Sequence, residues 1–246
     1  MGVLLTVKNA DFAANAIAFA APVTEGLEFW NYYTDPTKVG RNLVPGKAAP
    51  SIVGTPGAGA NFVTLSNNVN YLVTGLTDQA EVTMLTVARV NAGAAAGSFK
   101  YMIGNYSSGG TAPLGSNLYF VNNSANTLAT LCSRNNGTSD IAVAATLTPA
   151  NSGSTFAFYA ARMGASYLRI DDKTRGLNAS ASTANPRSTP SGNPYRIGGA
   201  GTTTGTGGVT DMAFAGLYSR TLTDAEIEAV YQRVKTFLSG KGIGGI

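Results

Sequence analysis

The segment that decides the fold is Asp211-Met-Ala-Phe-Ala-Gly-Leu-Tyr-Ser-Arg-Thr-Leu-Thr-Asp-Ala-Glu-Ile-Glu-Ala-Val-Tyr231. Its first part belongs to an apolar, aromatic-containing run, Val209–Ser219, which predicts a buried β-strand. Thr223 and Glu226 then form a capping-box pattern, in which each side chain bonds to the backbone N–H of the other residue. The segment therefore predicts a long strand that leads through a short turn into a helix.

The residues after the capping box predict a helix over about 223–239. Apolar side chains recur there at spacings of three and four and give one continuous stripe. Because a helix with such a stripe must bury it, we expect the helix to pack against a β core. The residues expected to hold it there are Thr223, Glu226, Ile227, Tyr231 and Phe237.

Upstream, the chain consists of short apolar or alternating runs separated by Gly, Pro, Asn and Ser, with turn signals at intervals of about ten residues. This spacing is typical of a sandwich or barrel. Predicted strands are Gly26–Tyr33, Asn61–Leu65, Tyr71–Thr74, Val82–Val90, Lys100–Gly104, Asn117–Val121, Thr127–Ser133, Asp140–Leu147, Thr155–Arg162, Tyr167–Asp171, Tyr195–Gly198 and Val209–Ser219. Ser180–Asn193 is expected to be an exposed loop, and Ala200–Gly208 a Gly- and Thr-rich turn.

The composition excludes several mechanisms. Among 246 residues there is no His and one Cys, Cys132, which is expected to be a small buried apolar residue. The absence of His removes the commonest neutral-pH general base and the commonest metal ligand. Only 12% of the residues are charged, about half the roughly 25% usual for soluble proteins, so the surface must be built largely from neutral polar and small residues.

The net charge of +4 does not indicate nucleic-acid binding, because Lys and Arg are scattered singly along the chain. The longest apolar run, Ala16–Val23, is too short to span a membrane, so we expect no membrane insertion. Met1–Val7 lacks a basic region before its apolar residues, and we therefore expect no secretory signal.

The strand-and-helix segment quoted above resembles the closing motif of concanavalin A-like, laminin-G-like jelly-roll domains. Tyr195–Gly199, Ser166–Asp172 and Val82–Val90 resemble earlier strands of the same family, whereas Thr155–Ala161 lacks the Trp-His pair common there. The resemblance implies an all-β, two-sheet jelly-roll β-sandwich with one C-terminal amphipathic helix. We expect residues 26–246 to form this domain and residues 1–25 to form an N-terminal segment that covers the sandwich or docks onto another subunit.

Val7–Ala16, Gly26–Trp30 and Arg41–Lys47 are similar to segments of small lectin-like proteins encoded among bacteriophage tail genes. This resemblance implies a virion component of the tail tip, baseplate or fibre, made in the host cytoplasm and exposed on the particle. The expected partners are other virion proteins, further copies of the chain (a trimer by analogy with tail fibres) and a host cell-surface glycan.

Carboxylate pairs must be considered, because the same fold carries glycosidases, which need two carboxyl groups about 5–10 Å apart. The Glu-x-Asp-x-x-Glu strand of laminarinase-type enzymes is absent, and Glu25, Glu28, Asp171 and Asp172 are expected to be solvated turn carboxylates. The chain is therefore expected not to be an enzyme; a glycan hydrolase or lyase with an unrecognised site is the alternative.

No cofactor is expected, and calcium is the one metal for which candidate ligands exist. Laminin-G-like domains often bind calcium through Asp, Asn and backbone oxygens, which makes Asp171 and Asp172 the first candidates. Further candidate oxygens are those of Asp140, Asn178 and Asp211.

Aromatic and amide side chains on loops are the groups expected to bind a sugar. The candidates are Asn105, Tyr106, Asn193 and Tyr195, whereas Trp30 and Tyr32, on one face of a strand, are expected to pack in the core. The function predicted from the sequence is a non-enzymatic virion protein with a lectin-like domain. A purely structural tail or capsid-decoration subunit remains open.

Overall fold

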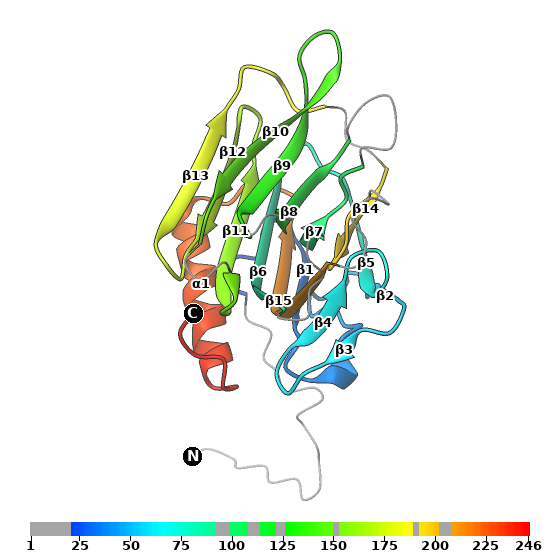
Figure 1. Ribbon diagram of the computed structural model, residues 1–246, viewed down its shortest axis with the longest axis vertical. Helices are drawn as coiled ribbons and strands as arrows, with labels where there is room; N and C mark the ends of the chain where they lie inside the picture. The colour runs from blue at the N-terminus through cyan, green and yellow to red at the C-terminus, as the bar shows by residue number, and fades with distance from the viewer. Residues whose placement is uncertain are drawn as a thin grey trace, which may run out of the picture.

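The computed structural model describes residues 21–91, 99–107, 114–121, 126–149, 153–188, 192–201 and 208–246. Two antiparallel sheets stack face to face, and one helix lies on the outer side of the larger sheet (Figure 1). This arrangement confirms the predicted two-sheet β-sandwich with one C-terminal helix. Among the described residues, no helix has the length and apolar character needed to cross a bilayer.

The larger sheet has eight strands. In spatial order they are β13 (Leu177–Ser182), β12 (Tyr167–Asp172), β11 (Ala157–Met163), β6 (Val82–Val90), β15 (Val209–Tyr218), β4 (Val63–Ser66) and β3 (Gly57–Ala58), while β1 (Leu27–Tyr32) also pairs with β15. The ten residues of β15 pair with β6 on one side and with β4 and then β1 on the other. The strand predicted from the deciding segment is therefore central to its sheet.

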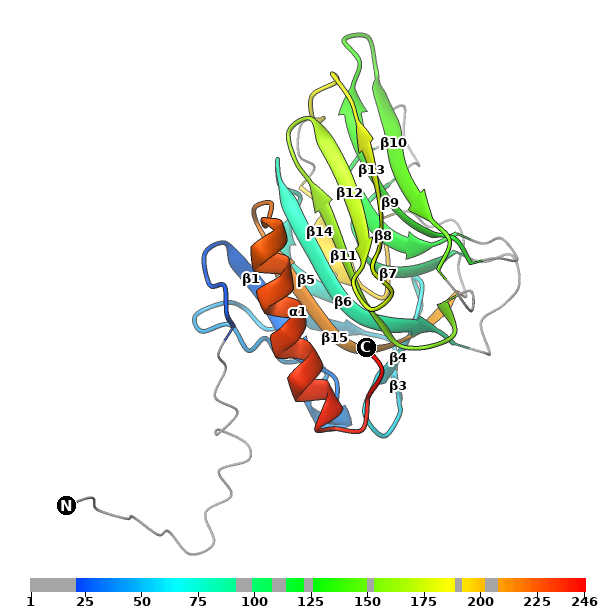
Figure 2. The ribbon, with the colours of Figure 1, turned by 90° about the vertical axis from the view of Figure 1, so that its left-hand side faces the viewer.

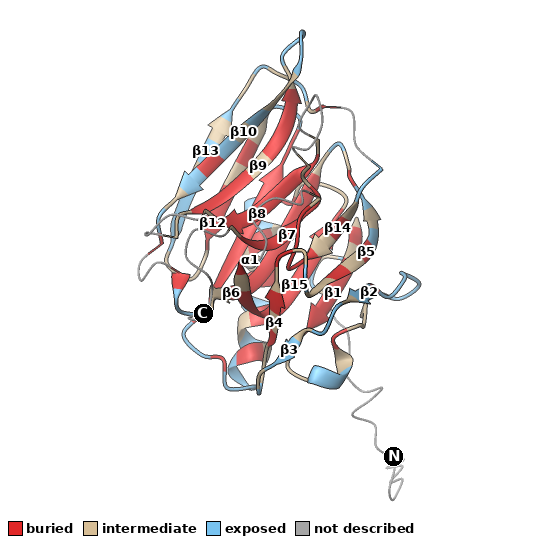
Figure 3. Cartoon of the chain, turned by 45° about the vertical axis from the view of Figure 1, so that its right-hand side comes forward, coloured by how far each residue is buried: buried red, intermediate tan, exposed pale blue. Residues whose placement is uncertain are grey.

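The smaller sheet has seven strands. In spatial order they are β10 (Asp140–Leu147), β9 (Leu128–Asn135), β8 (Ser116–Phe120), β7 (Lys100–Gly104), β14 (Pro194–Ile197), β5 (Tyr71–Thr77) and β2 (Ser51–Val53). The interior strands of both sheets are largely buried, whereas edge strands β10 and β13 are partly exposed (Figure 3).

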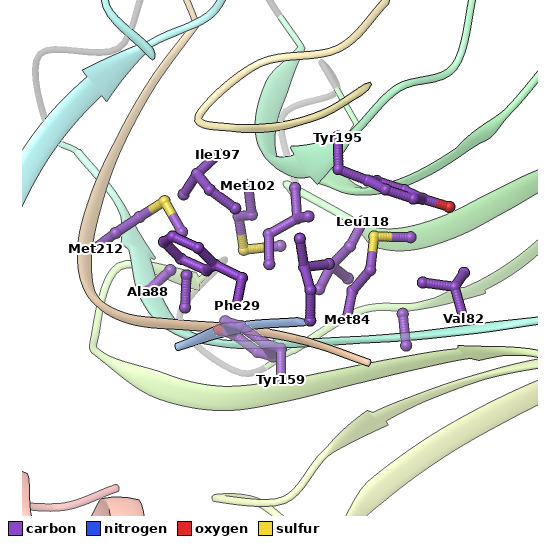
Figure 4. Close-up of a cluster of buried hydrophobic side chains, with 14 of the residues drawn as sticks. Phe29, Val82, Met84, Ala88, Met102, Leu118, Tyr159, Tyr195, Ile197 and Met212 are labelled. Carbon is purple, nitrogen blue, oxygen red and sulfur yellow. The ribbon is translucent and has the colours of Figure 1, made fainter. Parts of the chain in front are cut away.

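The main core fills the space between the two sheets (Figure 4). Met84, Met102 and Met212 pack there with Phe29 and Tyr159, and all five side chains are almost fully buried. Cys132 lies in the same core and is a free, buried cysteine, as predicted.

Gly198 directly follows β14, and its backbone lies close to side chains of this core. Its φ is +79°, and a Cβ atom added there would lie 2.4 Å from the Leu65 Cβ. The Ile-Gly pattern at this strand end therefore has a steric cause, because a side chain at residue 198 would collide with the core.

A second core lies between the larger sheet and α1 (Asp224–Ser239), which crosses the outer face of β15 and β6 (Figure 2). Ile227 and Tyr231 are buried against Phe158 of β11 and Phe214 of β15, while Phe237 packs at the edge. The capping box is present: Thr223 accepts a bond from the Glu226 N–H, and Glu226 accepts one from the Thr223 N–H. These contacts confirm the predicted helix and its docked face.

The predicted exposed loop Ser180–Asn193 needs correction, and most of the predicted turn Ala200–Gly208 lies outside the described residues. Within the stretch predicted as the exposed loop Ser180–Asn193, Ser180–Ser182 belong to β13, and Ser188 is buried. β13 was missed because Leu-Asn-Ala-Ser-Ala-Ser has no β-branched residue and is held by backbone pairing to β12. Residues 1–20 and 202–207 lie outside the described residues, whereas Ala21 and Val23 pack against the helix-side core.

Candidate functional site

Asn105 and Asn193, two of the predicted ligand residues, lie together in the structure. The Asn105 side chain is buried, donates to the Asn193 carbonyl oxygen at 3.0 Å and accepts from the Ser116 N–H at 2.9 Å. Both hydrogen bonds connect segments of the smaller sheet. The Asn105 amide therefore has a structural task at the point where β7, β8 and β14 meet.

Tyr195 lies beside this pair but points into the interior. Its ring is fully buried, and its hydroxyl group lies 2.8 Å from Ser116 Oγ and 3.1 Å from Asp78 Oδ1. Arg187 donates to the same aspartate oxygen at 2.7 Å. Burial raises the pKa of Tyr195 well above its usual range. A ligand contact through this ring would require the sandwich to rearrange.

Tyr106 is half-buried at the outer face of the smaller sheet. Its backbone N–H donates to Asn117 Oδ1 at 3.2 Å, and burial raises the pKa of its phenol. Three further aromatic rings, Phe99, Tyr101 and Tyr119, pack together on this face with centroids 5.4–5.8 Å apart. Tyr101 and Tyr119 are buried, so their rings stabilise the sheet instead of lying open on it.

Asp171 and Asp172 were predicted as solvated turn carboxylates, and this prediction is wrong. Both belong to β12 and are buried. Each forms an ion pair with an arginine of a neighbouring segment, which offsets the cost of burying its charge. Asp171 bonds to Arg162 of β11 at 3.0 Å, and Asp172 bonds to Arg175 at 2.6 Å. Burial raises the pKa of Asp172, although Arg175 opposes that effect.

The other acidic candidates also have protein partners. Asp211 accepts bonds from Arg89 and Asn91, and Asp140 accepts bonds from Asn135 and Ser188. Within the described ranges, no three His, Cys, Asp or Glu side chains gather closely enough to hold a metal ion. Calcium binding at Asp171 or Asp172 would have to displace an arginine from a buried ion pair.

A groove of about 440 Å³ lies where the loop after β1 meets the C-terminal end of α1. We call it the basic groove. Its lining consists of Asn31, Tyr32, Thr34, Asp35, Pro36, Lys38, Arg41, Leu43, Phe237 and Lys241. Neither the loop nor the helix end was predicted as a site, because the two groups of residues are about two hundred positions apart in the chain.

The loop wall of the basic groove begins with a short 3-10 helix, η2 (Pro36–Lys38). Asp35 caps it by accepting from the Thr37 N–H at 2.9 Å, and its other carboxylate oxygen lies 2.9 Å from Lys38 Nζ. The Thr37 hydrogen bonds and Lys38 lower the pKa of Asp35 to about 2. Asp35 is therefore ionised at neutral pH and is engaged within its own turn.

Two asparagines fix this loop to β1. Asn31, buried, donates through Nδ2 to the Lys38 and Val39 carbonyl oxygens, both at 3.1 Å. Asn42 accepts from the Trp30 N–H at 3.2 Å and donates to the Glu28 carbonyl oxygen at 2.9 Å. Since the backbone is fixed on both sides of Arg41, the groove is preformed.

The floor of the groove is aromatic. Tyr32 of β1 and Phe237 of α1 lie with ring centroids 3.9 Å apart, and Phe214 supports Tyr32 from below at 5.3 Å. Burial raises the pKa of Tyr32 to about 12, against the smaller opposing effects of Trp30 and Arg233. Phe237 remains partly exposed and lines the groove.

A second groove, of about 500 Å³, lies on the other side of the C-terminal segment, and we call it the neutral groove. Arg89 lies between the rings of Phe62 and Phe156, 5.1 and 4.6 Å from their centroids, and bonds to Asp211 at 2.9 Å. The arginine charge is therefore compensated inside the protein. The remaining lining residues are Ala60, Asn61, Ser154, Thr155, Gly242, Ile243, Gly244 and Gly245.

Comparison with solved structures finds the same architecture in the binding domains of botulinum neurotoxins. The serotype D binding domain matches with a TM-score of 0.61 at 8% identity, over 86% of this chain and 53% of that one. The receptor-binding domain of the C/D mosaic serotype gives 0.60 at 9% identity, over 86% and 52%. The "Binding domain of Botulinum Neurotoxin DC in complex with SialylT" gives 0.57 at 8% identity, over 86% and 51%.

No protein-family model and no curated protein matches the chain. The chain spans about half the length of the neurotoxin domains it resembles, and the identities are below 10% in the three comparisons. The similarity therefore shows the fold, a two-sheet jelly-roll β-sandwich, and does not by itself carry over what those domains bind.

Proposed function

We propose that this chain is a non-enzymatic, lectin-like recognition domain of a bacteriophage virion, and that it binds a host surface glycan in the basic groove. The observation that carries the proposal is the groove itself: a preformed concave surface with a partly exposed phenylalanine ring and several hydrogen-bonding groups. Sugar sites combine these two features, because the apolar face of a sugar ring packs on an aromatic ring while its hydroxyl groups need polar partners.

Two residues of the segments that resemble phage tail proteins line the groove. Val7–Ala16, Gly26–Trp30 and Arg41–Lys47 carry that resemblance, and Arg41 and Leu43 of the third segment lie in the lining, whereas Val7–Ala16 lies outside the described residues. Asn42, between them, bonds to the backbone of Trp30 and Glu28. Part of one similar segment therefore lies on the surface that the geometry favours.

The carboxylates favour binding over hydrolysis. The described lining of the basic groove contains one carboxylate, Asp35, and glycoside hydrolysis by the usual mechanisms needs two. With a pKa of about 2, Asp35 cannot act as a general acid at neutral pH. The described residues that line the neutral groove include no acid.

The test is binding of the purified protein to a glycan array and to intact host cells, with Phe237→Ala against Phe62→Ala. Both substitutions remove a half-buried phenylalanine from a groove beside the C-terminal segment, so they are matched in chemistry. We expect Phe237→Ala to weaken binding at least about tenfold, which corresponds to a loss of about 1.4 kcal/mol of binding free energy. Phe62→Ala should leave the affinity within about twofold of wild type. Thermal unfolding of both variants checks that each remains folded.

Binding that depends on Phe62 and not on Phe237 would contradict the assignment of the site. Absence of binding to any glycan or cell would favour the second candidate, a structural tail or capsid-decoration subunit. The edge strands of the two sheets support that candidate. β13 and residues 141–147 of β10 carry no charged side chain, and an uncharged edge strand can pair with a strand of another chain. Imaging of an intact particle would locate the chain in either case.

A further inference from the structure

The basic groove carries an excess of positive charge that comes from three separate segments. Lys38 ends η2, Arg41 follows in the loop, and Lys241 follows α1. Asp35 is the one acid in the described lining, so the formal charge of the lining is three positive minus one negative, or +2. Because the chain as a whole carries only +4, this small surface holds a large share of its net charge.

Lys241 is not needed to complete the helix. The backbone N–H groups of Gly240 and Lys241 bond to the carbonyl oxygens of Thr236 and Leu238, and the Ile243 N–H adds a second bond to Leu238. A lysine near a helix C-terminus often caps such carbonyls with its ammonium group. Here the backbone performs that task, and the Lys241 ammonium lies 5.9 Å from the Phe237 ring centroid, at the groove.

The positions of the cations are fixed by the fold. Asn31 holds the carbonyl oxygens of Lys38 and Val39, and Asn42 fixes the residue next to Arg41. Ile243, buried in the helix-side core, fixes the chain two residues after Lys241. A ligand therefore meets a positive surface whose backbone is already ordered, which lowers the entropy cost of binding.

We infer that the basic groove selects saccharides that carry an anionic group, such as a carboxylate. The sugar ring packs on Phe237, and the anionic substituent lies between Arg41 and Lys241. The inference rests on the proposed function, because it names the class of glycan that the same groove takes. Guanidinium and ammonium groups that line one concavity favour an anion through charge-assisted hydrogen bonds, and water is partly excluded there.

The experiment compares matched pairs of oligosaccharides by isothermal titration calorimetry. Oligosaccharides containing uronic acid and sialic acid are each measured beside the same oligosaccharide with the carboxylate reduced to a hydroxymethyl group. A sugar phosphate is included to distinguish a carboxylate from a phosphate preference. We expect at least one acidic member to bind about tenfold or more tightly than its neutral counterpart, and we expect the difference to shrink as salt is raised.

Three variants locate the effect. Arg41→Gln and Lys241→Gln should each remove most of the acidic preference, because each should weaken binding of the acidic member far more than binding of its neutral counterpart. Asp35→Asn keeps a residue that can cap η2 but removes the one negative charge, and it should strengthen binding of the acidic member several-fold. Lys47→Gln is the control, because Lys47 lies in the same loop but pairs with Glu28 at 2.6 Å and lies outside the groove.

The outcomes separate the two proposals. Equal binding of acidic and neutral members overturns the anionic preference and leaves the lectin-like function standing. An acidic preference that survives Arg41→Gln and Lys241→Gln, or that falls equally in Lys47→Gln, overturns the assignment to this groove. If no member of the panel binds, the proposed function itself fails.

Discussion

Cations inside the sandwich and cations around the basic groove are held in different ways. The side chains of Arg162 and Arg187 lie in the interior and that of Arg175 is half-buried, and each has an aspartate oxygen within 3.0 Å. In the groove, Lys38 pairs with Asp35 at 2.9 Å, and Arg41 and Lys241 line the same surface. Arg134 is also buried, but its guanidinium group donates to the carbonyl oxygens of residues 164, 165 and 167 instead of to a carboxylate.

The difference follows from solvation. A buried charge without a partner costs several kcal/mol, so an interior arginine persists only where the fold supplies a carboxylate or several carbonyl oxygens. A cation beside an open groove keeps part of its hydration, so its position depends less on a carboxylate partner. The interior cations therefore serve stability, whereas the groove cations keep contact with solvent.

The largest effect is expected when an unpaired charge enters the interior. Ile227 is 1% exposed and packs between α1 and the larger sheet, so Ile227→Asp should lower the free energy of unfolding by about 4 kcal/mol. Ala229→Asp places the same charge on the exposed side of the helix and should cost less than about 1 kcal/mol. Urea unfolding of both variants measures this difference. Equal stability of the two would show that the helix is peripheral.

Removing an interior partner should be the next largest effect. Asp78 accepts bonds from Arg187 and Tyr195, so Asp78→Ala leaves a buried guanidinium without its carboxylate and should cost about 3 kcal/mol. Glycan binding by the folded fraction should stay unchanged, because none of these residues lines the basic groove. Loss of binding without loss of stability would contradict the structural assignment of Asp78 and Tyr195.

Removal of the helix cap at Glu226 should lower the free energy of unfolding by less than these two substitutions, and the loss should depend on pH. Glu226 bonds to Arg220 and to the Thr223 backbone, and these contacts, the arginine first, lower its pKa to about 2. Because the folded pKa is below the unfolded value, ionised Glu226 stabilises the protein above about pH 4.5, and that contribution is lost as the pH falls toward about 2.

We therefore expect Glu226→Ala to cost about 1 kcal/mol at pH 7. Glu226→Gln, which can keep the capping bonds, should cost less and should flatten the acid limb of stability. Thermal melts from pH 2 to pH 7 measure both variants. A difference from wild type that grows on acidification would contradict the account.

The smallest effects on stability should come from the groove cations. Arg41→Gln and Lys241→Gln should each change the free energy of unfolding by less than about 0.5 kcal/mol, as substitutions at half-buried or exposed positions usually do. Differential scanning calorimetry provides the measurement. A loss of 2 kcal/mol or more from either substitution would place that cation with the interior set.

The strands and the helix could be predicted because their signals are local. The bounds of β6, β7 and β10 agree with the predicted ranges, and the capping box identified the start of α1. β13 was missed because small polar residues carry no strand signal when an edge strand is held by backbone pairing alone.

The site could not be predicted, because its parts meet only after folding. Tyr32 and Phe237 become neighbours when α1 docks on the larger sheet, and nothing near either residue in the sequence indicates the other. The same reason explains the wrong prediction for Asp171: its partner Arg162 lies on the adjacent strand, and the strand register decides whether the two meet. Tyr195 was predicted to be an aromatic residue on a loop, because the buried residues that its hydroxyl group contacts, Asp78 and Ser116, are distant in the sequence.

Recognition in the basic groove can be mapped by chemical shifts in the isotope-labelled protein during titration with an oligosaccharide that binds. We expect the amide signals of Asn31, Lys38–Leu43, Phe237 and Lys241 to shift together, while those of Asn105 and Asn193 stay in place. Shifts confined to Asn105, Tyr106 and Asn193, with the groove unaffected, would contradict this expectation and would place recognition on the smaller sheet.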